Sequence, residues 1–114
     1  MGRLTSHVLD TASGKPAAAM QVELLDAASR VLKNLRTNSD GRFDAPLLEG
    51  ADLKKGRYIL RFHAGDYFRA QGTKLAEPPF LDVIDVPFGI ADTEAHYHVP
   101  LLVSPYSLTT YRGS

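Results

Sequence analysis

The sequence predicts an all-β protein, either a sandwich or a barrel of short strands. Turn-forming residues recur at short intervals, at positions 13–16, 38–41, 55–56, 77–79 and 104–105. Between these turns, several segments alternate apolar and polar residues, which is typical of strands that bury one face. A single short segment has the pattern of a helix. These three observations favour an all-β fold.

Seven strands are expected, at residues 4–10, 18–24, 31–37, 57–62, 84–88, 96–103 and 107–112. In the second strand, Met20, Val22 and Leu24 alternate with polar or small residues, so these side chains are expected to face the core. In residues 96–103 the same alternation places Tyr97 and Val99 inside. The residues between them must therefore point outward.

One segment departs from the alternation and predicts a short helix. It begins at Asp66, a suitable N-cap, contains good helix formers and ends at Gly72, a residue type common at helix ends. No repeat, low-complexity tract or domain boundary interrupts the chain. Residues 1–114 are therefore expected to form a single domain, which is a usual length for one.

The composition narrows the possible functions. The 114 residues include 13 basic and 13 acidic side chains, and a net charge of zero argues against nucleic acid as a partner. Zero net charge also removes a repulsion between copies of the chain, which leaves oligomerisation open. Because the chain has no cysteine, it has no disulfide scaffold, no thiolate metal site and no cysteine nucleophile.

Targeting signals are mostly absent from the sequence; Gly2 and Ser6 match the short myristoylation pattern, which we interpret as a chance match. The sequence has no apolar N-terminal stretch like that of a signal peptide, no run long enough to span a bilayer, and no peroxisomal tripeptide at its C-terminus. We therefore expect a cytoplasmic location and no membrane partner.

The most informative motif is formed by His96, Tyr97 and His98. Residues two apart on a strand share a face, so the two histidines are expected to point away from the core, toward solvent or another subunit. They could simply be paired on the surface of a sheet. A functional interpretation adds His7, which shares the face of its own strand with Thr5. Three histidines could also hold a zinc ion with an open fourth position.

Two further features are candidates for binding. Arg42 follows a hairpin-type turn at residues 40–41, whose tight geometry holds the next residue firmly. Its planar guanidinium suits a delocalised anion better than lysine does, although a solvated arginine is the alternative. The chain closes on Tyr111, Arg112, Gly113 and Ser114, which bring a phenol, a guanidinium and a hydroxyl to a terminus that would ordinarily fray.

Taken together, these segments resemble the 5-hydroxyisourate hydrolases, the transthyretin-related enzymes of urate degradation. The resemblance rests on residues 4–10, 14–17, 37–42, 96–102 and 111–114, in this order along essentially the whole chain. The block His-Tyr-His-Val-Pro-Leu-Leu is highly specific. So is the terminal Tyr-Arg-Gly-Ser, which separates the enzymes from transthyretin itself.

The resemblance implies a fold and an assembly. The fold is a transthyretin-like, antiparallel sandwich of two sheets with about eight strands and one short helix. The assembly is a homotetramer, a dimer of dimers with active sites in clefts where the dimers meet. An interface would explain why histidines lie on an outer face. Neither a cofactor nor a metal ion is implied.

The resemblance also implies a reaction and a division of roles. The N1–C6 bond of 5-hydroxyisourate is hydrolysed, which gives 2-oxo-4-hydroxy-4-carboxy-5-ureidoimidazoline on the way to allantoin. The implied catalytic residues are His7, His98 and Ser114. The implied substrate-binding residues are Arg42, Tyr111, Arg112 and Gly113. His96 is implied to support these residues without itself contacting the substrate. Hydrolysis needs a base for water and donors for the oxyanion, and His7, relayed through Ser114, is the expected base.

Two other functions compete with this interpretation. One is a transthyretin-like carrier of small hydrophobic ligands, which would have no need of His7, Arg42 and His98 together. The other is a hydrolase that uses a metal ion bound by histidine, which would lose activity in the presence of a chelator.

Overall fold

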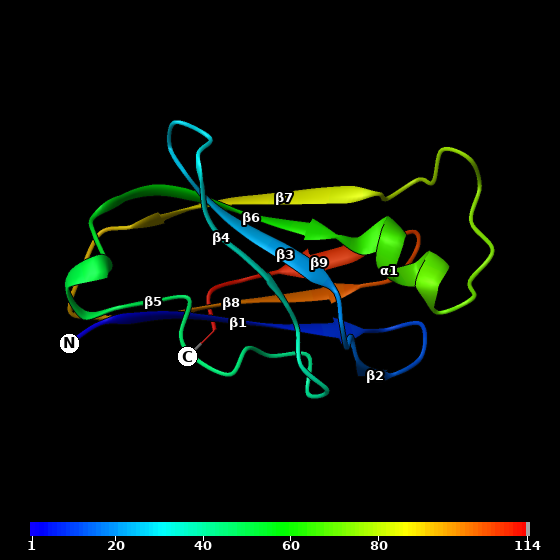
Figure 1. The fold of residues 1–114 in the computed structure, drawn as a ribbon, viewed down its shortest axis with the longest axis horizontal. Coiled ribbons are helices and arrows are strands. Elements are labelled where there is room, and N and C mark those ends of the chain that lie inside the picture. Colours follow the sequence, from blue (N-terminus) through cyan, green and yellow to red (C-terminus); the bar gives the residue numbers. More distant parts are fainter. Residues whose placement is uncertain (114) are drawn as a thin grey trace.

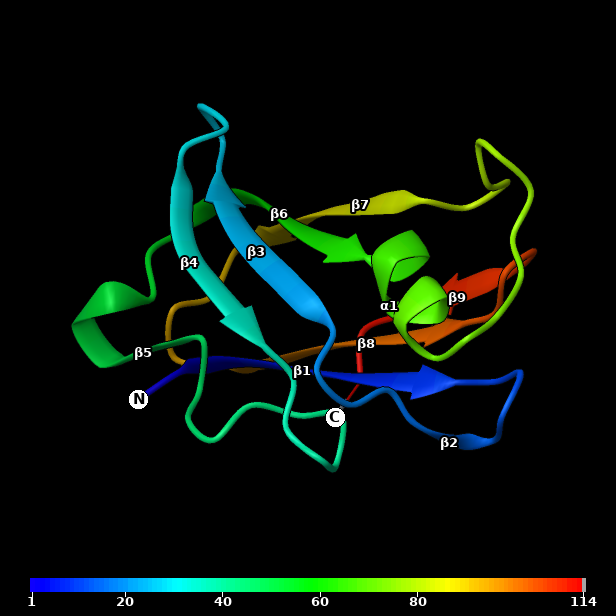
Figure 2. The same cartoon turned by 45° about the vertical axis from the view of Figure 1, so that its right-hand side comes forward.

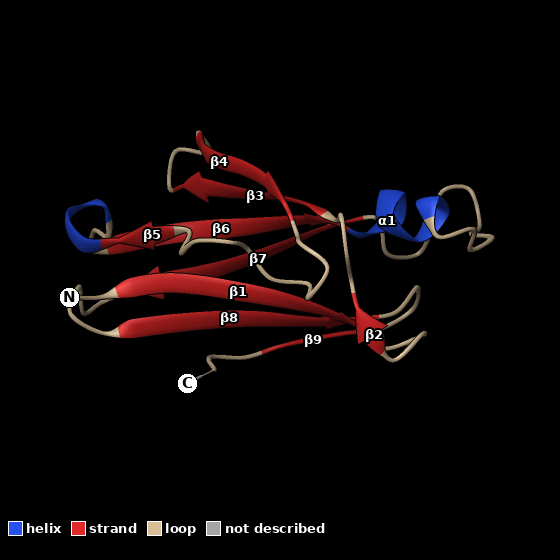
Figure 3. Ribbon diagram, turned by 60° about the horizontal axis from the view of Figure 1, so that its bottom comes forward, coloured by secondary structure: helices blue, strands red, loops and turns tan. Residues whose placement is uncertain are grey.

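The computed structural model describes residues 1–113, which form two β-sheets packed face to face (Figures 1 and 3). One sheet contains β1 (Arg3–Asp10), β2 (Lys15–Pro16), β5 (Leu48–Glu49), β8 (His96–Val103) and β9 (Leu108–Thr110). The other contains β3 (Gln21–Asp26), β4 (Val31–Arg36), β6 (Gly56–His63) and β7 (Val83–Ile90). A 3-10 helix, Gly50–Asp52, and the α-helix α1, Ala64–Ala70, complete the fold. The expected all-β sandwich with one short helix is confirmed.

The core lies between the two sheets and follows the predicted alternation. Met20, Val22 and Leu24 are almost fully buried, as are Leu101 and Val103 on β8. Burying an aliphatic side chain of this size stabilises the fold by about 1.5–3 kcal/mol. The inward side of each strand is therefore fixed, and the side chains between these positions lie on the outer faces.

One pair of strands differs from the expected antiparallel arrangement. β1 and β8 run parallel, with Leu4 opposite Tyr97 and Val8 opposite Leu101, whereas the other pairs are antiparallel. Alternation shows which face of a strand is buried, but it does not show which strand lies beside it or in which direction. Because the chain crosses to the other sheet between β1 and β8, no hairpin imposes an antiparallel pair here.

Several predicted boundaries are wrong for local reasons. The second predicted strand begins at Gln21 and not at residue 18, because Ala19 has a φ of 60° and interrupts the extended backbone. The helix begins two residues earlier than predicted, at Ala64, and ends at Ala70. β2 and β5 were not predicted, since two residues are too few to show an alternation.

The helix is attached to the end of β1 by a buried hydrogen bond. The Tyr67 hydroxyl donates to Asp10 Oδ2 over 2.9 Å. Burial, followed by this bond to a carboxylate, raises the pKa of Tyr67 to about 12. The tyrosine therefore stays protonated and keeps donating across the ordinary pH range. Asp10 also caps the turn after β1 by accepting from the backbone N–H groups of Ala12 and Ser13.

The segment at residues 37–47 crosses from β4 to β5 and so passes from one sheet to the other (Figure 2). On its way it lies along the edge of β1, where the Val8 N–H donates to the Gly41 carbonyl over 2.8 Å. Further on, the Leu47 N–H donates to the Leu4 carbonyl, also over 2.8 Å. The crossing segment therefore covers the middle of this edge, between the short strands β2 and β5.

Candidate active site

The outer faces of β1 and β8 form the floor of a cleft. On β1, Thr5 and His7 alternate with buried neighbours and so point outward, as the sequence predicts. The parallel register places Thr5 opposite His98 and Arg3 opposite His96. Two outward-facing rows from strands far apart in the sequence thus lie side by side.

Four side chains in these rows form a continuous set of hydrogen bonds. His7 Nδ1 lies 2.7 Å from His98 Nε2, and the two rings stack with centroids 4.9 Å apart. The other nitrogen of that ring, His98 Nδ1, lies 2.7 Å from Thr5 Oγ1. The same hydroxyl lies 2.8 Å from His96 Nε2. His96 is therefore hydrogen-bonded to this set through Thr5, and its ring centroid also lies 6.2 Å from that of His98.

Both histidines at the centre of the site favour the neutral form. Burial lowers the pKa of His7, and the positive charge of Arg42 lowers it further. Burial is also the main cause of the lowered pKa of His98. The positive charges of His7, Arg42 and His96 lower it further, in that order. A neutral imidazole keeps a lone pair, so these rings can accept a proton near neutral pH.

Arg42 is held beside His7 by the backbone that precedes it. Asn38 Oδ1 accepts hydrogen bonds from the N–H groups of Asp40 and Arg42, at 2.9 and 3.1 Å. Gly41 has a φ of 71°, and a Cβ there would run into the Val8 carbonyl on the edge of β1. Only glycine therefore lets this turn pack so closely against β1. The predicted tight turn thus brings Arg42 to the cleft.

The C-terminal residues return to the same face and cover His98. The Gly113 N–H donates to the His98 carbonyl over 2.7 Å. Arg112 stacks its guanidinium 4.3 Å from the centre of the Tyr97 ring and donates from Nη2 to the His96 carbonyl over 3.3 Å. Tyr111 and Gly113 line the cleft, whereas Arg112 lines a second groove together with Tyr111 and residues of β7, β8 and β9. Ser114 lies outside the described residues.

The cleft has a volume of about 580 Å³. Its lining includes His7, Arg42, His96, His98, Tyr111 and Gly113, all of which the sequence analysis names. It also includes Arg3, Phe43 and Asp44, which that analysis missed. Their place depends on the β1–β8 register and on the crossing segment, and neither leaves a local signal in the sequence.

Water attack on a polarised carbonyl fits this set of groups. Neutral histidines supply proton acceptors, and Arg42 supplies a fixed positive charge for a developing oxyanion. Among residues 1–113, no three or more histidine, aspartate or glutamate side chains are grouped so that they could hold a metal ion. His7 and His98 direct nitrogens at each other and not at a common point. In the described part of the chain, no helix is long and apolar enough to cross a membrane.

The fold and this site define a known class of protein. The chain belongs to the HIUase/Transthyretin family, whose model matches residues 4–113. Among curated relatives, it is 56% identical to 5-hydroxyisourate hydrolase 2 of Rhizobium meliloti, over 99% of this chain and 97% of that one. It is 60% identical to the 5-hydroxyisourate hydrolase of Mesorhizobium japonicum, over 99% of this chain and 93% of that one.

Solved structures show the same fold. An (S)-allantoin synthase matches with a TM-score of 0.95 and 44% identity over 99% of this chain, which spans 44% of that longer protein. The 5-hydroxyisourate hydrolase of Klebsiella pneumoniae matches with a TM-score of 0.85 and 34% identity over the full length of both chains. Sea bream transthyretin in complex with thyroxine also has a TM-score of 0.85, with 26% identity over 97% of this chain and 94% of that one.

Proposed function

We propose that this protein hydrolyses 5-hydroxyisourate in urate degradation, opening the six-membered ring at the N1–C6 bond. The observation that carries the proposal is the direct hydrogen bond between His7 and His98, 2.7 Å long, in a cleft that Arg42 also lines. The curated relatives at 56% and 60% identity are named for this activity. The product is 2-oxo-4-hydroxy-4-carboxy-5-ureidoimidazoline.

His7 is the general base in this proposal. Its Nδ1 faces His98, which leaves Nε2 as the ring nitrogen available to a water molecule. The proton goes to His7 as the water oxygen bonds to C6, and it later returns to the departing ring nitrogen. His98 orients His7 and shares its proton. Ser114 would assist this transfer through its hydroxyl.

Arg42 binds the electron-rich substrate ring and stabilises the charge that develops on the C6 oxygen. A planar guanidinium can donate two parallel hydrogen bonds to such a group. Tyr111 and Gly113 shape the wall of the cleft that they line. Arg112 acts indirectly, because its stacking on the Tyr97 ring holds in place the C-terminal segment that contains Gly113.

The activity can be tested by ultraviolet absorbance. Urate and urate oxidase generate the unstable intermediate in the cuvette, and its decay is followed with and without this protein. We expect faster decay with the protein present. Decay at the spontaneous rate would contradict the proposed function.

A transthyretin-like carrier is the less favoured alternative. The sea bream transthyretin structure holds thyroxine, yet it shares only 26% identity with this chain. A carrier of apolar ligands gains little from three histidines and an arginine in its binding cleft, because each of these groups must lose water when an apolar ligand binds.

The proposal includes assembly into a homotetramer, a dimer of dimers with the clefts between dimers. Among residues 1–113, β7 and β9 are edge strands on one side of the sandwich, where they line a common groove. Large apolar side chains are exposed near these edges, namely Phe80, Val83, Tyr106, Leu108 and Tyr111. Free edges with apolar side chains favour pairing with another copy.

The assembly can be tested by light scattering after size-exclusion chromatography. We expect the mass of four chains, and we expect Phe80→Glu to reduce it. A monomer at assay concentration would contradict the tetramer. The proposal also treats residues 1–114 as one functional domain in the cytoplasm, which fractionation of expressing cells would test.

A further inference from the structure

The four hydrogen-bonded side chains of the cleft form an unbroken path for a proton. The path runs from His7 through His98 and the Thr5 hydroxyl to His96, with successive contacts of 2.7, 2.7 and 2.8 Å. Each distance is that of a well-formed hydrogen bond. Imidazole and hydroxyl groups can donate through one atom or bond while they accept through another, so each member can pass a proton on.

With all three rings neutral, two hydrogen-bond patterns satisfy every contact while the Thr5 hydroxyl donates to one ring and accepts from the other, as a relay requires. In the first pattern, His7 Nδ1 donates to His98, His98 Nδ1 donates to Thr5, and Thr5 donates to His96 Nε2. In the second pattern, all three bonds are reversed. The first pattern leaves a lone pair on His7 Nε2, and the second leaves a proton there.

We propose that Thr5 and His96 are positioning residues of a proton relay that moves the proton accepted by His7 to the far end of the cleft. The relay rests on the proposed function, in which His7 Nε2 takes a proton from the attacking water. An O–H bond of water breaks, and its electron pair forms the new bond to C6. The Nδ1 proton of His7 then moves to His98, that of His98 moves to Thr5, and that of Thr5 moves to His96.

The charges and protons balance at each end of the relay. After the forward transfer, His7 and His98 are neutral in the second pattern, and His96 is an imidazolium that carries the single positive charge. When the C6–N1 bond breaks, His7 Nε2 returns its proton to the nitrogen, and the three transfers reverse. The first pattern is restored, and the substrate has gained one water molecule.

The surroundings favour the movement of charge toward His96. Arg42 and burial both oppose a positive charge on His7 and His98, and each lowers the pKa of these two rings. His98 is only 9% exposed, whereas His96 is partly exposed to solvent. Among residues 1–113, the charged and titratable groups that line the same cleft are Arg3, Arg42, Asp44, Tyr111 and the three histidines.

The hydroxyl of Thr5 is the link that can be removed with the least disturbance. Thr5→Val keeps the β-branched shape but cannot bridge His96 and His98, whereas Thr5→Ser restores a hydroxyl. Thr11→Val is the matched control, because it removes a hydroxyl that donates to the Val103 carbonyl at the end of the same strand. Circular dichroism of each variant shows whether the sandwich is intact.

Steady-state kinetics give the first measurement. We expect Thr5→Val to lower kcat by about tenfold or more while KM changes less than about twofold, since general acid–base assistance contributes roughly 10²–10⁴-fold in total. We also expect the acid limb of the kcat profile to shift. Thr5→Ser should recover most of kcat, and Thr11→Val should match the wild type.

Nitrogen-15 NMR of the histidine rings gives a second measurement that does not depend on turnover. In the wild type, we expect the signals of His98 Nδ1 and His96 Nε2 to show that one of these two nitrogens is protonated and the other is not, because the Thr5 hydroxyl accepts from one and donates to the other. In Thr5→Val, the His96 Nε2 signal should lose the shift that its hydrogen bond to the hydroxyl causes. The tautomer of His98 should also change, because Nδ1 has lost its partner.

The two measurements distinguish the relay from the activity on which it rests. If the wild type is active and Thr5→Val keeps its kcat, pH profile and histidine ring signals, the relay is wrong and the proposed function stands. If the wild type does not speed the decay of the substrate, the proposed function fails and the catalytic relay fails with it. Ring signals that Thr5→Val alters would then show only the hydrogen-bonded path.

Discussion

His63 and His98 both lie on outward-facing strand positions, and each uses Nε2 in a short hydrogen bond to a side chain on a neighbouring strand. The partner differs. His63 Nε2 lies 2.6 Å from the Glu23 carboxylate on the four-stranded sheet, whereas His98 Nε2 lies 2.7 Å from His7 on the other sheet. The partner of His63 is therefore a carboxylate, whereas the partner of His98 is a second imidazole.

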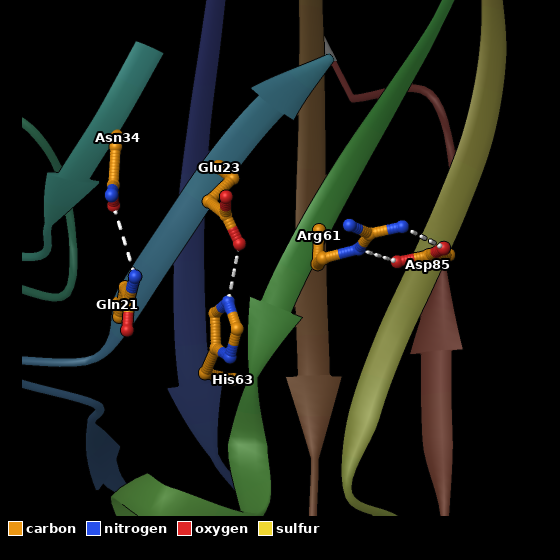
Figure 4. Close-up of polar contacts among 6 residues, drawn as sticks. All are labelled: Gln21, Glu23, Asn34, Arg61, His63 and Asp85. Atoms are coloured by element: carbon orange, nitrogen blue, oxygen red, sulfur yellow. Dashed lines mark hydrogen bonds and ion pairs between the residues drawn. The ribbon is translucent and has the colours of Figure 1, made fainter. Parts of the chain in front are cut away.

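The outer face of the four-stranded sheet carries complementary pairs. Beside His63 and Glu23, Arg61 makes two bonds to Asp85, at 2.8 and 3.0 Å (Figure 4). Cross-strand pairs of this kind hold each other in place. Groups paired in this way have little capacity left for a substrate.

Among residues 1–113, no carboxylate is hydrogen-bonded to the histidines on the outer face of the other sheet, whose side-chain partners are Thr5 and one another. The charged side chain that acts most on His7 is Arg42, which has the same sign as a protonated imidazole. The lone pairs are therefore retained, and the site can accept a proton. Histidine on an outward-facing strand does not by itself indicate catalysis. In this molecule the sign of the neighbouring charge distinguishes the two faces.

The largest effect is expected from breaking the contact between the two catalytic rings. His98→Asn can retain a hydrogen bond to Thr5, but its side chain is too short to reach His7 in place of Nε2. We expect kcat/KM to fall by roughly 10²–10⁴-fold, the usual contribution of acid–base groups, as measured by the ultraviolet assay. Arg42→Ala should also abolish measurable turnover.

His63→Asn is the matched control, because it removes a histidine on the opposite face that is also hydrogen-bonded to a side chain on a neighbouring strand. Its kcat/KM should stay within about twofold of the wild type, as is usual for a residue outside the reacting groups. All three variants should keep the oligomeric mass of the wild type. Wild-type rates in His98→Asn, or a comparable loss in His63→Asn, would remove the functional difference between the faces.

Gly113 offers a smaller disturbance of the same site. An added Cβ would lie 2.7 Å from His98 Cδ2 and 3.4 Å from its Cβ and Cγ atoms, so Gly113→Ala must displace either the tail or the ring. We expect at least a ~10-fold loss of kcat, because displacements of about 1 Å near reacting groups cost up to 10²-fold.

Removal of residues 112–114 is the companion variant, and it should abolish activity while the far-ultraviolet dichroism of the sandwich remains. Full activity in either variant would exclude the tail from the mechanism.

The pH dependence should follow from the lowered pKa values of His7 and His98. Because these rings stay neutral at pH values below the ordinary histidine pKa of about 6.5, the acid limb of the kcat/KM profile should lie at a pH lower than about 6.5. The unfolded chain binds protons more readily than these buried rings, so the free energy of unfolding should decrease as pH falls from about 6.5 through the folded values.

Urea titrations at several pH values measure this loss of stability. His98→Gln should make this pH-dependent loss of stability smaller, because one of the two rings with a lowered pKa is absent. An acid limb above the ordinary histidine pKa in the wild type would contradict the assignment of neutral rings.

The sequence was sufficient to predict the outward direction of His96 and His98. That prediction depends only on alternation along one strand, and buried Tyr97 and Val99 confirm it. It could not show that the Thr5 hydroxyl joins the two histidines. Thr5 and His98 are 93 residues apart in the sequence, and their contact depends on a parallel register that the packing of the whole sandwich determines.

The position of Arg42 likewise depends partly on a local sequence pattern and partly on long-range packing. The residues before it predict a tight turn, and the structure has one, with Asn38 as its cap. Its place beside His7 depends on the contact of Gly41 with the edge of β1. That edge is free to receive the turn because β2 and β5 pair only with the two ends of β1. No local pattern in the sequence contains this information.

The smallest effect is expected on the opposite face, from Arg61→Gln. The variant loses both bonds to Asp85, but the two side chains are 32% and 42% exposed, and exposed ion pairs contribute little to stability. The melting temperature should therefore change little, and high salt should reduce even that difference because it screens the wild-type pair. In the ultraviolet assay, kcat should equal that of the wild type. A clear loss of kcat in Arg61→Gln, with the oligomeric mass unchanged, would mean that the four-stranded sheet influences the histidine cleft through the core, and the two faces could no longer be treated as independent.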